Sequence, residues 1–308
     1  MTKSRLARRP RRLTSSKAAV NKTAYLMMAP YMIPFLILTV IPVITAIALG
    51  FTYFNMLETP KFIGLENYAR MFLDDDVFPQ VLKNTLLFAV ITGPVSYCIS
   101  FLSAWLINEF PPAIRSFFTL AFYSPTLTGN LYFVWTYVFS GDRYGILNSI
   151  LLNLGIEDTP VQWLSDPKTM MGCLIIIQLW SSFGVSFLAF IAGFQNMDRS
   201  LSEAGAIDGI HNRWQELWYI TLPSMAPQLI FSAVQQIGAC FSVGQIVQAL
   251  AGFPTTNYAA DTLLTYMLDV GTVRFEMGYA SAIATFLFLM MVFVNFIITH
   301  LLRRFSAG

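Results

Sequence analysis

The chain has 308 residues, of which 56% are hydrophobic, 15% aromatic and only 12% charged. Soluble domains carry about 25% charged residues, so this composition provides too little polar surface for a water-soluble protein. The mean hydropathy of +0.59 indicates lipid as the main solvent. The same figures exclude a disordered chain and a disulfide-rich scaffold.

Six stretches of the sequence are long and free of charged residues. A membrane-spanning helix needs about 20 mainly apolar residues, and each stretch has at least that length. Backbone polar groups in lipid must be satisfied within the segment, so runs of this kind are helices. We therefore predict an all-α membrane protein with six spans, at approximately 24–54, 84–108, 116–140, 169–195, 224–250 and 277–302.

The chain begins with a basic tail, residues 1–23, that holds eight Lys or Arg and no acid. A signal peptide is one alternative, but its apolar core of about 7–15 residues would be much shorter than the run 24–54. A nuclear or mitochondrial targeting sequence is another alternative. We expect a cytoplasmic anchor for a tilted or proline-kinked first helix, in contact with anionic lipid rather than with nucleic acid.

The distribution of basic residues between the loops predicts the orientation. With the N-terminus inside, the inner segments (the tail, 109–115, 196–223 and 303–308) hold 13 of the 19 Lys and Arg. The outer segments hold the other six, at 55–83, 141–168 and 251–276. Because inner loops carry the excess of Lys and Arg, both termini, including the short tail 303–308, are expected in the cytoplasm.

The segment 196–223, between the fourth and fifth spans, has an unusual composition. We predict that Ser202 caps a short helix beginning at Glu203, whose carboxylate suits the positive end of the helix dipole. Gly209 is expected to end this helix. Its middle carries three small residues, Ala204, Gly205 and Ala206. Small residues allow close backbone approach, so the helix suits a cleft on another protein; an amphipathic connector lying on the membrane is the alternative.

This segment resembles the signature of the membrane subunits of binding-protein-dependent ABC importers: EAA, three residues, G, nine residues, I, one residue, LP. The matching residues here are Glu203, Ala204, Gly205, Gly209, Ile220, Leu222 and Pro223. This chain has Gly205 in place of the second alanine, and ten residues instead of nine separate Gly209 from Ile220.

The resemblance implies that 202–212 is a coupling helix seated in a cleft of a partner ATPase. The residues assigned to ATPase coupling are Ser202, Glu203, Ala204, Gly205, Ala206, Asp208, Gly209, Ile220, Leu222 and Pro223. Pro223 also suits the first turn of the fifth span.

Other segments are similar to sugar-importer permeases of the maltose and oligosaccharide type. They are FIGLENYARMF at 62–72, LKNTLLF at 82–88, GILNSILLNLG at 145–155, WLSDP at 163–167 and MGYASAIATFLF at 277–288. The resemblance implies a six-helix permease of the type I importer fold in a bacterial cell membrane. It also implies a second permease, two cytoplasmic ATPases, an extracytoplasmic binding protein and a sugar substrate; a glycerol-phosphate-like or other small solute is the alternative.

The sequence shows no sign of an enzyme or of a cofactor site. No Gly-Lys dipeptide occurs, so the chain lacks a GxxxxGK[ST] phosphate loop, and ATP hydrolysis is expected in partner subunits. The three cysteines lie in separate apolar runs, and His211 and His300 are too far apart in sequence to predict a metal site. The run Asp74, Asp75 and Asp76 is expected to be a solvated turn.

The fifth span carries a stripe of polar residues at helical spacing: Gln228, Ser232, Gln235, Ser242 and Gln245. Polar amides are unfavourable against lipid, so this face is expected to line a translocation path for a sugar. Hydrogen bonding between helices is the alternative. Two other functions remain open: a secondary transporter, which usually carries ionisable groups within its spans, and a non-transporting membrane scaffold.

Overall fold

A computed structural model describes residues 17–127 and 133–306 of the chain. The chain divides into two compact units, Met1–Ala48 and Leu49–Gly308. Three predicted segments lie partly outside the described residues: the tails 1–23 and 303–308 and the third span, 116–140.

The described part of the N-terminal unit, from Lys17 onwards, is a long apolar helix with one irregular turn. Helix α1 (Lys17–Phe35) contains Pro30 and Pro34, and a π-helical turn, η1 (Leu36–Val40), follows it before α2 (Ile41–Leu49). Proline cannot donate a backbone hydrogen bond, and such positions commonly distort the adjacent turn. The helical stretch 24–49 is long and apolar enough to cross a membrane.

The larger unit opens with a small hairpin and then the longest helix of the described chain. Strands β1 (Thr52–Tyr53) and β2 (Lys61–Phe62) pair antiparallel, with Thr52 opposite Phe62. Helix α3 (Glu66–Leu73) is held on the hairpin by Asn67, whose amide donates to the carbonyls of Gly50 and Thr52 at 2.9 Å. Helix α4 (Phe78–Asn108) follows.

Most of the remaining described residues are helical. The elements from the centre of the chain are α5 (Pro112–Leu127), α6 (Val134–Val138), α7 (Ile146–Asn153), α8 (Met170–Trp180) and α9 (Val185–Gln195). Next come α10 (Arg199–Ile207), α11 (Arg213–Glu216), η3 (Leu217–Thr221), α12 (Leu222–Ser224) and α13 (Ala226–Phe241). The last elements are α14 (Gly244–Leu250), η4 (Thr256–Tyr258), α15 (Leu263–Leu268), η5 (Asp269–Val273) and α16 (Met277–Ser306).

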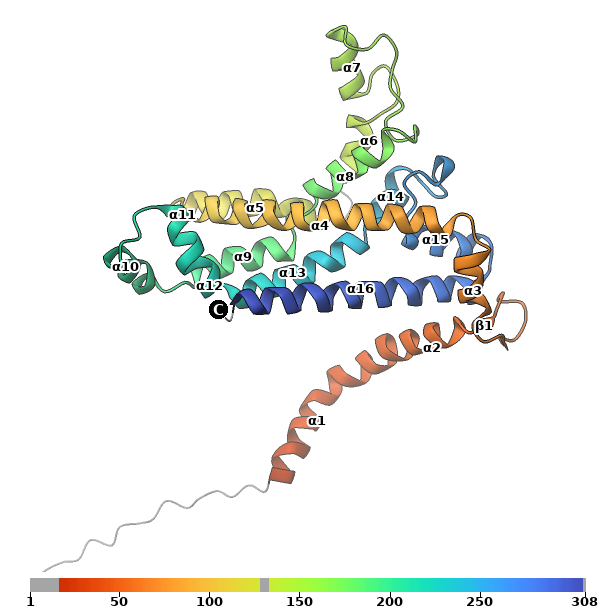
Figure 1. Ribbon diagram of the computed structural model, residues 1–308, viewed down its shortest axis with the longest axis horizontal. Coiled ribbons are helices and arrows are strands. Elements are labelled where there is room, and N and C mark those ends of the chain that lie inside the picture. The colour runs from red at the N-terminus through yellow and green to blue at the C-terminus, as the bar shows by residue number, and fades with distance from the viewer. Residues whose placement is uncertain (1–16, 128–132, 307–308) are drawn as a thin grey trace, which may run out of the picture. The chain divides into compact units, whose positions relative to one another are not determined.

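The larger unit is built around four helices that run side by side. Helix α13 packs against α4, α9 and α16, and α4 packs against α9. Figure 1 shows α10, α11 and α12 gathered at one end of these helices, with α3 and α15 at the other. The predicted predominantly helical fold is thus confirmed, with the short hairpin as the exception among the described residues.

Three apolar clusters fill the larger unit. One joins α4 to α15 and α16 around Phe78 and Ile283, and a second joins α8 to α14 around Ile177 and Val247. A third joins α4 to α9 around Phe101 and Phe190, next to α10–α12. Because α4 contributes to all three, it connects the two ends of the unit.

The fourth and fifth predicted spans are each interrupted, which corrects the expectation of continuous helices. The fourth breaks between α8 and α9, where the Ser182 hydroxyl donates to the Leu179 carbonyl at 2.6 Å. The fifth breaks after Phe241, where the Ser242 hydroxyl donates to the Gly238 carbonyl at 2.9 Å. Such local hydrogen bonds of serine compete with regular helix bonding.

The segment 251–276, predicted as an outer loop, contains a packed helix. Its apolar helical portion, Leu263–Val273, is packed against α4 and α16, and Leu263, Tyr266 and Val270 are buried. The Thr85 hydroxyl of α4 accepts a hydrogen bond from the backbone amide of Leu263 at 2.8 Å, so α4 also satisfies a backbone donor at the start of α15. At 11 residues this helix is too short to span a bilayer, so length alone does not reveal it.

Five described helical stretches are long and apolar enough to cross a membrane: 24–49, 78–108, 170–195, 226–250 and 277–303, of which 170–195 and 226–250 include the breaks described above. Of the predicted third span, 116–140, the structure describes α5 and α6 but not residues 128–132 between them. The predicted count of six spans therefore stays a prediction.

Candidate functional site

Helix α10 is the short helix predicted in segment 196–223, but it begins earlier than the sequence suggests. Asp198 is its N-cap, and the Asp198 carboxylate accepts from the backbone amide of Ser200 at 3.0 Å. Ser202 lies inside the helix and Glu203 in its second turn, so the prediction that Ser202 caps the helix is wrong. The predicted interaction of the Glu203 carboxylate with the helix dipole is also wrong, because that interaction is confined to the first turn of a helix.

The end of α10 agrees with the sequence. The last helical residue is Ile207, Asp208 follows as the C-cap, and Gly209 has φ of +95°. This left-handed conformation is readily adopted only by glycine, which explains why the helix stops here.

The outward face of α10 carries two acidic side chains beside small and apolar ones. Glu203, Ala204, Ala206 and Asp208 are exposed, and Ile207 is 87% exposed. At Ala204 and Ala206 the exposed surface of α10 has little side-chain bulk, which leaves room for another backbone to come close.

The inward face of α10 rests on the segment that leads into α13. Gly205 is buried, and a Cβ atom at this position would overlap Cδ1 of Ile220 and lie 3.0 Å from Cδ1 of Ile210. Glycine therefore permits the close approach of α10 to η3. The two motif residues Gly205 and Ile220 are thus direct neighbours.

An ionic anchor ties the α10–α11 region to the end of α4. Arg213 forms ion pairs of 2.9 Å with Glu216 and with Glu109. A hydrogen bond from the Ser202 side chain lowers the pKa of Glu216 and outweighs the opposing effect of burial, and Arg213 lowers it further. Ser202, although not a cap, therefore links α10 to α11 through a carboxylate that stays ionised at neutral pH.

Aromatic packing strengthens the same connection. The rings of Trp214 and Trp105 lie 5.1 Å apart, and Leu217 is buried in the cluster around Phe101. Trp218 and Tyr219 remain exposed. The remaining motif residues, Leu222 and Pro223, form the short helix α12 immediately before α13.

The polar residues of the fifth span divide into two groups. Ser232 is fully buried, and its hydroxyl donates to the Ser186 carbonyl of α9 at 3.1 Å. Gln228 packs its side chain towards Gly193 of α9, and its buried Oε1 has no hydrogen-bond partner among the described residues. Both therefore face a neighbouring helix of the same chain.

Gln235, Ser242 and Gln245 are exposed on the surface of the larger unit. The break after Phe241 means that they do not share one continuous helix, contrary to the prediction of a single stripe. Exposed amides on apolar segments are costly in lipid, so this surface requires water or a polar partner.

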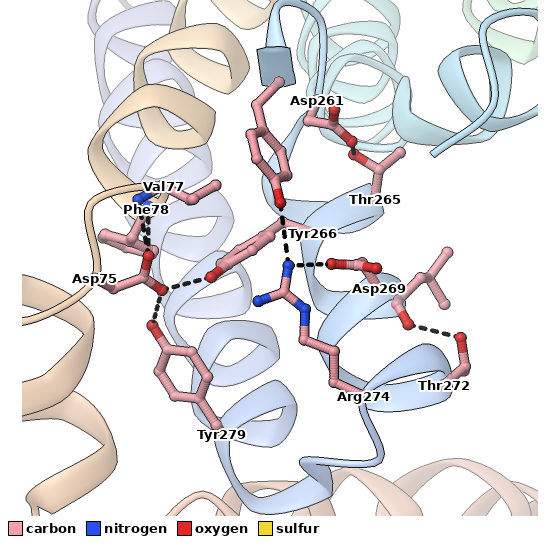
Figure 2. A network of polar contacts seen from close by, with 12 residues as sticks. Asp75, Val77, Phe78, Asp261, Thr265, Tyr266, Asp269, Thr272, Arg274 and Tyr279 are labelled. Atoms are coloured by element: carbon pink, nitrogen blue, oxygen red, sulfur yellow. Dashed lines mark hydrogen bonds and ion pairs between the residues drawn. The ribbon is translucent and has the colours of Figure 1, made fainter. Parts of the chain in front are cut away.

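A polar network at the opposite end of α4 has no counterpart among the sequence predictions. Asp75 Oδ1 accepts from the amides of Val77 and Phe78 at the start of α4, at 2.9 and 3.1 Å. Its Oδ2 accepts from the hydroxyls of Tyr266, at 2.6 Å, and Tyr279. Figure 2 shows the carboxylate between the two tyrosines. The prediction of a solvated turn is therefore wrong for Asp75.

The network extends to the charged residues around η5. Arg274 pairs with the buried carboxylate of Asp269 at 2.5 Å and donates to the Tyr258 hydroxyl at 3.2 Å, as Figure 2 shows in part. Burial alone would raise the pKa of Asp75, but the hydrogen bonds from Tyr266 and Tyr279 hold it below its ordinary value. The network thus fastens α4, α15 and α16 together.

The sequence matches a known family over most of its length. Residues 97–307 match the family described as "Binding-protein-dependent transport system inner membrane component". The chain is 32% identical to "Probable ABC transporter permease protein YesP" of Bacillus subtilis, over 93% of this chain and 91% of that protein.

Two further relatives are named for their substrates. "Arabinooligosaccharides transport system permease protein AraP" of Bacillus subtilis is 29% identical over 95% of this chain and 91% of its own length. "Lactose transport system permease protein LacF" of Rhizobium radiobacter is 26% identical over 92% of this chain and 95% of its own length.

Solved structures share the fold. A chain of a bacterial ABC transporter involved in the import of the acidic polysaccharide alginate matches with a TM-score of 0.74 and 24% identity, over 92% of this chain and 96% of that one. A chain of the alginate transporter in complex with a periplasmic protein matches with a TM-score of 0.76 and 23% identity, over 96% and 98%. The chain is therefore a multi-pass protein of the cell membrane. It belongs to the family of inner membrane components of binding-protein-dependent transport systems.

Proposed function

We propose that this chain is one permease subunit of an ATP-driven importer that takes up a sugar or oligosaccharide. Support comes from the substrates in the names of the relatives AraP and LacF, each of which aligns over more than nine-tenths of this chain. In this proposal a second permease completes the pathway, two cytoplasmic ATPases drive it, and an extracytoplasmic binding protein delivers the sugar.

Helix α10 is proposed as the coupling helix. The observation that carries this role is the seating of Gly205 against Ile220, with the small exposed residues Ala204 and Ala206 on either side of it. Seated in this way, α10 moves with η3 and α12, which lead directly into α13. A displacement of α10 by an ATPase would therefore be transmitted to α13, which packs on α4, α9 and α16.

The exposed polar group Gln235, Ser242 and Gln245 is proposed to line the translocation path. Amide and hydroxyl groups supply both donors and acceptors, which is what sugar hydroxyls require. Ser232 and Gln228 are proposed instead to stabilise the packing of α13 on α9, in keeping with the hydrogen bond of Ser232 to Ser186.

The orientation that follows from this role places both termini and α10 in the cytoplasm. The domain organisation is then a basic tail, 1–23, a permease domain of six spans, 24–302, and a short tail, 303–308. The excess of Lys and Arg in the tail, 109–115, 196–223 and 303–308 supports it.

The experiment that tests the proposal is assembly and coupling of the complex. The chain, expressed with the two ATPases and the second permease, is expected to purify as one complex whose ATPase rate rises with the sugar-loaded binding protein. Gly209→Val, which forces a β-branched residue to φ of +95°, should keep the complex in the membrane and reduce this rise. A complex without ATPases, or full stimulation in the variant, would contradict the assignment of α10.

A further inference from the structure

A polar cavity of about 400 Å³ lies beside α10 and α11, at the end of the larger unit where α4 is followed by α5. The end of α9 and residues of α10 and α11 complete its lining. Four of the lining residues are charged: Glu109, Arg115, Arg213 and Glu216. The cavity therefore brings together two carboxylates and two guanidinium groups, from α5, α11 and the end of α4.

The two arginines of this cavity differ in how their donors are used. Arg213 pairs with Glu216 through Nη1 and with Glu109 through Nη2, each at 2.9 Å. Arg115 donates from Nη2 to the Phe110 carbonyl at 3.2 Å, and it forms no ion pair with the part of the chain that the structure describes. Its Nε is buried and has no hydrogen-bond partner among the same residues. A buried donor without an acceptor is unfavourable, so Arg115 lacks an acceptor in this arrangement.

The carboxylate of Glu109 is within reach of Arg115. Glu109 is the C-cap of α4, and Arg115 lies in the first turn of α5, which begins at Pro112. The carbonyl that Arg115 contacts belongs to Phe110, the residue directly after Glu109, and both charged side chains line the same cavity. The Glu109 side chain is 43% exposed, and exposed side chains change rotamer readily. Rotation of side chains can therefore bring the two groups together without movement of α4 or α5.

The ion pair between Arg213 and Glu109 joins α11 to α4. Arg213 begins α11, which lies between α10 and η3, so it belongs to the segment proposed to move when an ATPase displaces α10. Glu109 ends α4, one of the four helices on which the larger unit is built. Displacement of α10 would therefore open this ion pair, whereas Arg213 would keep Glu216 within its own short helix.

We infer that Arg115 is a positioning residue for coupling, which binds Glu109 when α10 and α11 are displaced and Arg213 is withdrawn. The inference rests on the proposed function, in which α10 is the coupling helix. The new pair gives the buried Nε of Arg115 the acceptor that it lacks while Arg213 holds Glu109. Glu109 then has two alternative partners, one on α11 and one on α5, as expected of an element with two discrete arrangements.

The role of Arg115 is tested by coupling in the assembled importer, reconstituted in lipid nanodiscs. The ATPase rate is measured with and without the sugar-loaded binding protein that stimulates the unmodified complex. Arg115→Gln should lower the stimulated rate at least about twofold, at unchanged basal rate and unchanged yield of the complex. Arg115→Lys, which keeps the charge, should restore most of the stimulation.

The matched control is Arg143→Gln, at an exposed arginine outside the cavity, which should leave stimulation unchanged. Full stimulation in Arg115→Gln, or an equal loss in Arg143→Gln, would overturn the inference.

A double variant separates pairing with Glu109 from a merely structural role of Arg115. If Arg115 acts through Glu109, Arg115→Gln should cause no further loss in a complex that already carries Glu109→Gln. The comparison uses the stimulated ATPase rates of the two single variants and the double variant. Losses that multiply would mean that Arg115 acts independently of Glu109, and they would overturn the inference.

The exchange of partners is tested by zero-length crosslinking of the assembled complex. A carbodiimide joins a carboxylate to a lysine amine as an amide and takes up the water released, so it reports only groups in contact. In Arg213→Lys, the crosslink to Glu109 should form without nucleotide and decline after trapping with ATP and vanadate. In Arg115→Lys, the crosslink to Glu109 should show the opposite dependence. Mass spectrometry identifies the joined residues, and yields that do not depend on nucleotide would overturn the inference.

Failure of the proposed function gives a different result. In that case no ATPase purifies with the chain, or no binding protein stimulates the unmodified complex. A normally stimulated complex in which Arg115→Gln has no effect, and in which the crosslinks ignore nucleotide, contradicts only the role of Arg115.

Discussion

Gly205 and Ile220 are packed together so closely that any side chain at position 205 would displace the end of the Ile220 side chain. They are separated by 15 positions, across the turn at Gly209 and the helix α11. Their contact is what fixes the small helix α10 on the segment that continues into α13.

Substitution of Gly205 should depend on side-chain size. Gly205→Ala displaces only the flexible ends of Ile220 and Ile210, and it gains about 1 kcal/mol of helix propensity, so transport should be preserved. Gly205→Leu should push α10 off η3 and reduce sugar uptake at least about tenfold while the protein remains in the membrane. Ile220→Ala, combined with Gly205→Leu, should restore part of the uptake. Equal uptake by the Ala and Leu variants would contradict the packing argument.

The Asp75 network should stabilise the end of α4. Asp75→Asn removes the charge that receives four hydrogen bonds, and a loss of about 1–3 kcal/mol of unfolding free energy is expected. Thermal unfolding in detergent measures it. Asp76→Asn, at the exposed neighbour, is the control and should leave stability unchanged. If the two variants unfold alike, the network does not hold α4, α15 and α16 together.

The stability of the protein should depend on pH through the Glu216 carboxylate. Its pKa is lower in the folded protein than in the unfolded chain, because Ser202 and Arg213 stabilise the ionised form. Its contribution is therefore fully present above the unfolded pKa, about 4.3, and is lost as the pH falls through the lower folded pKa. The difference in melting temperature between the wild type and Glu216→Gln should be positive at pH 7 and shrink to zero in strong acid. A difference that grows on acidification would contradict the sign.

The two groups of polar residues in α13 and α14 should respond differently to substitution. Gln235→Leu and Gln245→Leu should lower sugar uptake at unchanged yield of the complex, because the path loses hydrogen-bond partners for the sugar. Ser232→Ala, which breaks the bond to Ser186, should cost about 0.6 kcal/mol of stability and leave uptake per complex unchanged. Yield and uptake are measured on the same preparations. Parallel losses of yield and uptake in the Gln variants would mean that these residues hold subunits together.

The orientation is tested by cysteine labelling in cells, with Cys98 first replaced by alanine because it is exposed. Tyr144→Cys, at a 91% exposed position, should react with an impermeant maleimide from outside. Asp208→Cys should react only after permeabilisation, in cells without the ATPases. Gly145 is unsuitable as a reporter, because a Cβ there would overlap the Ser140 carbonyl. The reverse labelling would contradict the orientation and the coupling helix together.

The helical fold could be predicted from the sequence because lipid leaves few alternatives. Charge-free runs must satisfy their own backbone, so the helices around Phe88, Phe190 and Ile283 follow from composition alone. The breaks at Ser182 and Ser242 could not be predicted, because one serine hydroxyl bonding to a preceding carbonyl gives no signal in hydropathy.

The residues proposed for ATPase coupling follow from a motif in the sequence, but their contacts could not be predicted from it. Small residues before Gly209 indicate a compact helix, whereas its N-cap is Asp198 and not Ser202. The role of Asp75 was hidden because its tyrosine partners lie 191 and 204 positions away. Only tertiary packing brings such groups together.

ATP hydrolysis in partner subunits is proposed to drive sugar import through this chain. The most direct measurement is uptake of a radiolabelled oligosaccharide into proteoliposomes that contain the whole complex, with binding protein outside and ATP inside. Uptake is expected to need both ATP and the binding protein, to persist when ionophores dissipate all ion gradients, and to be lost in Gly205→Leu. Uptake that follows the ion gradient and proceeds without ATP would contradict the proposal.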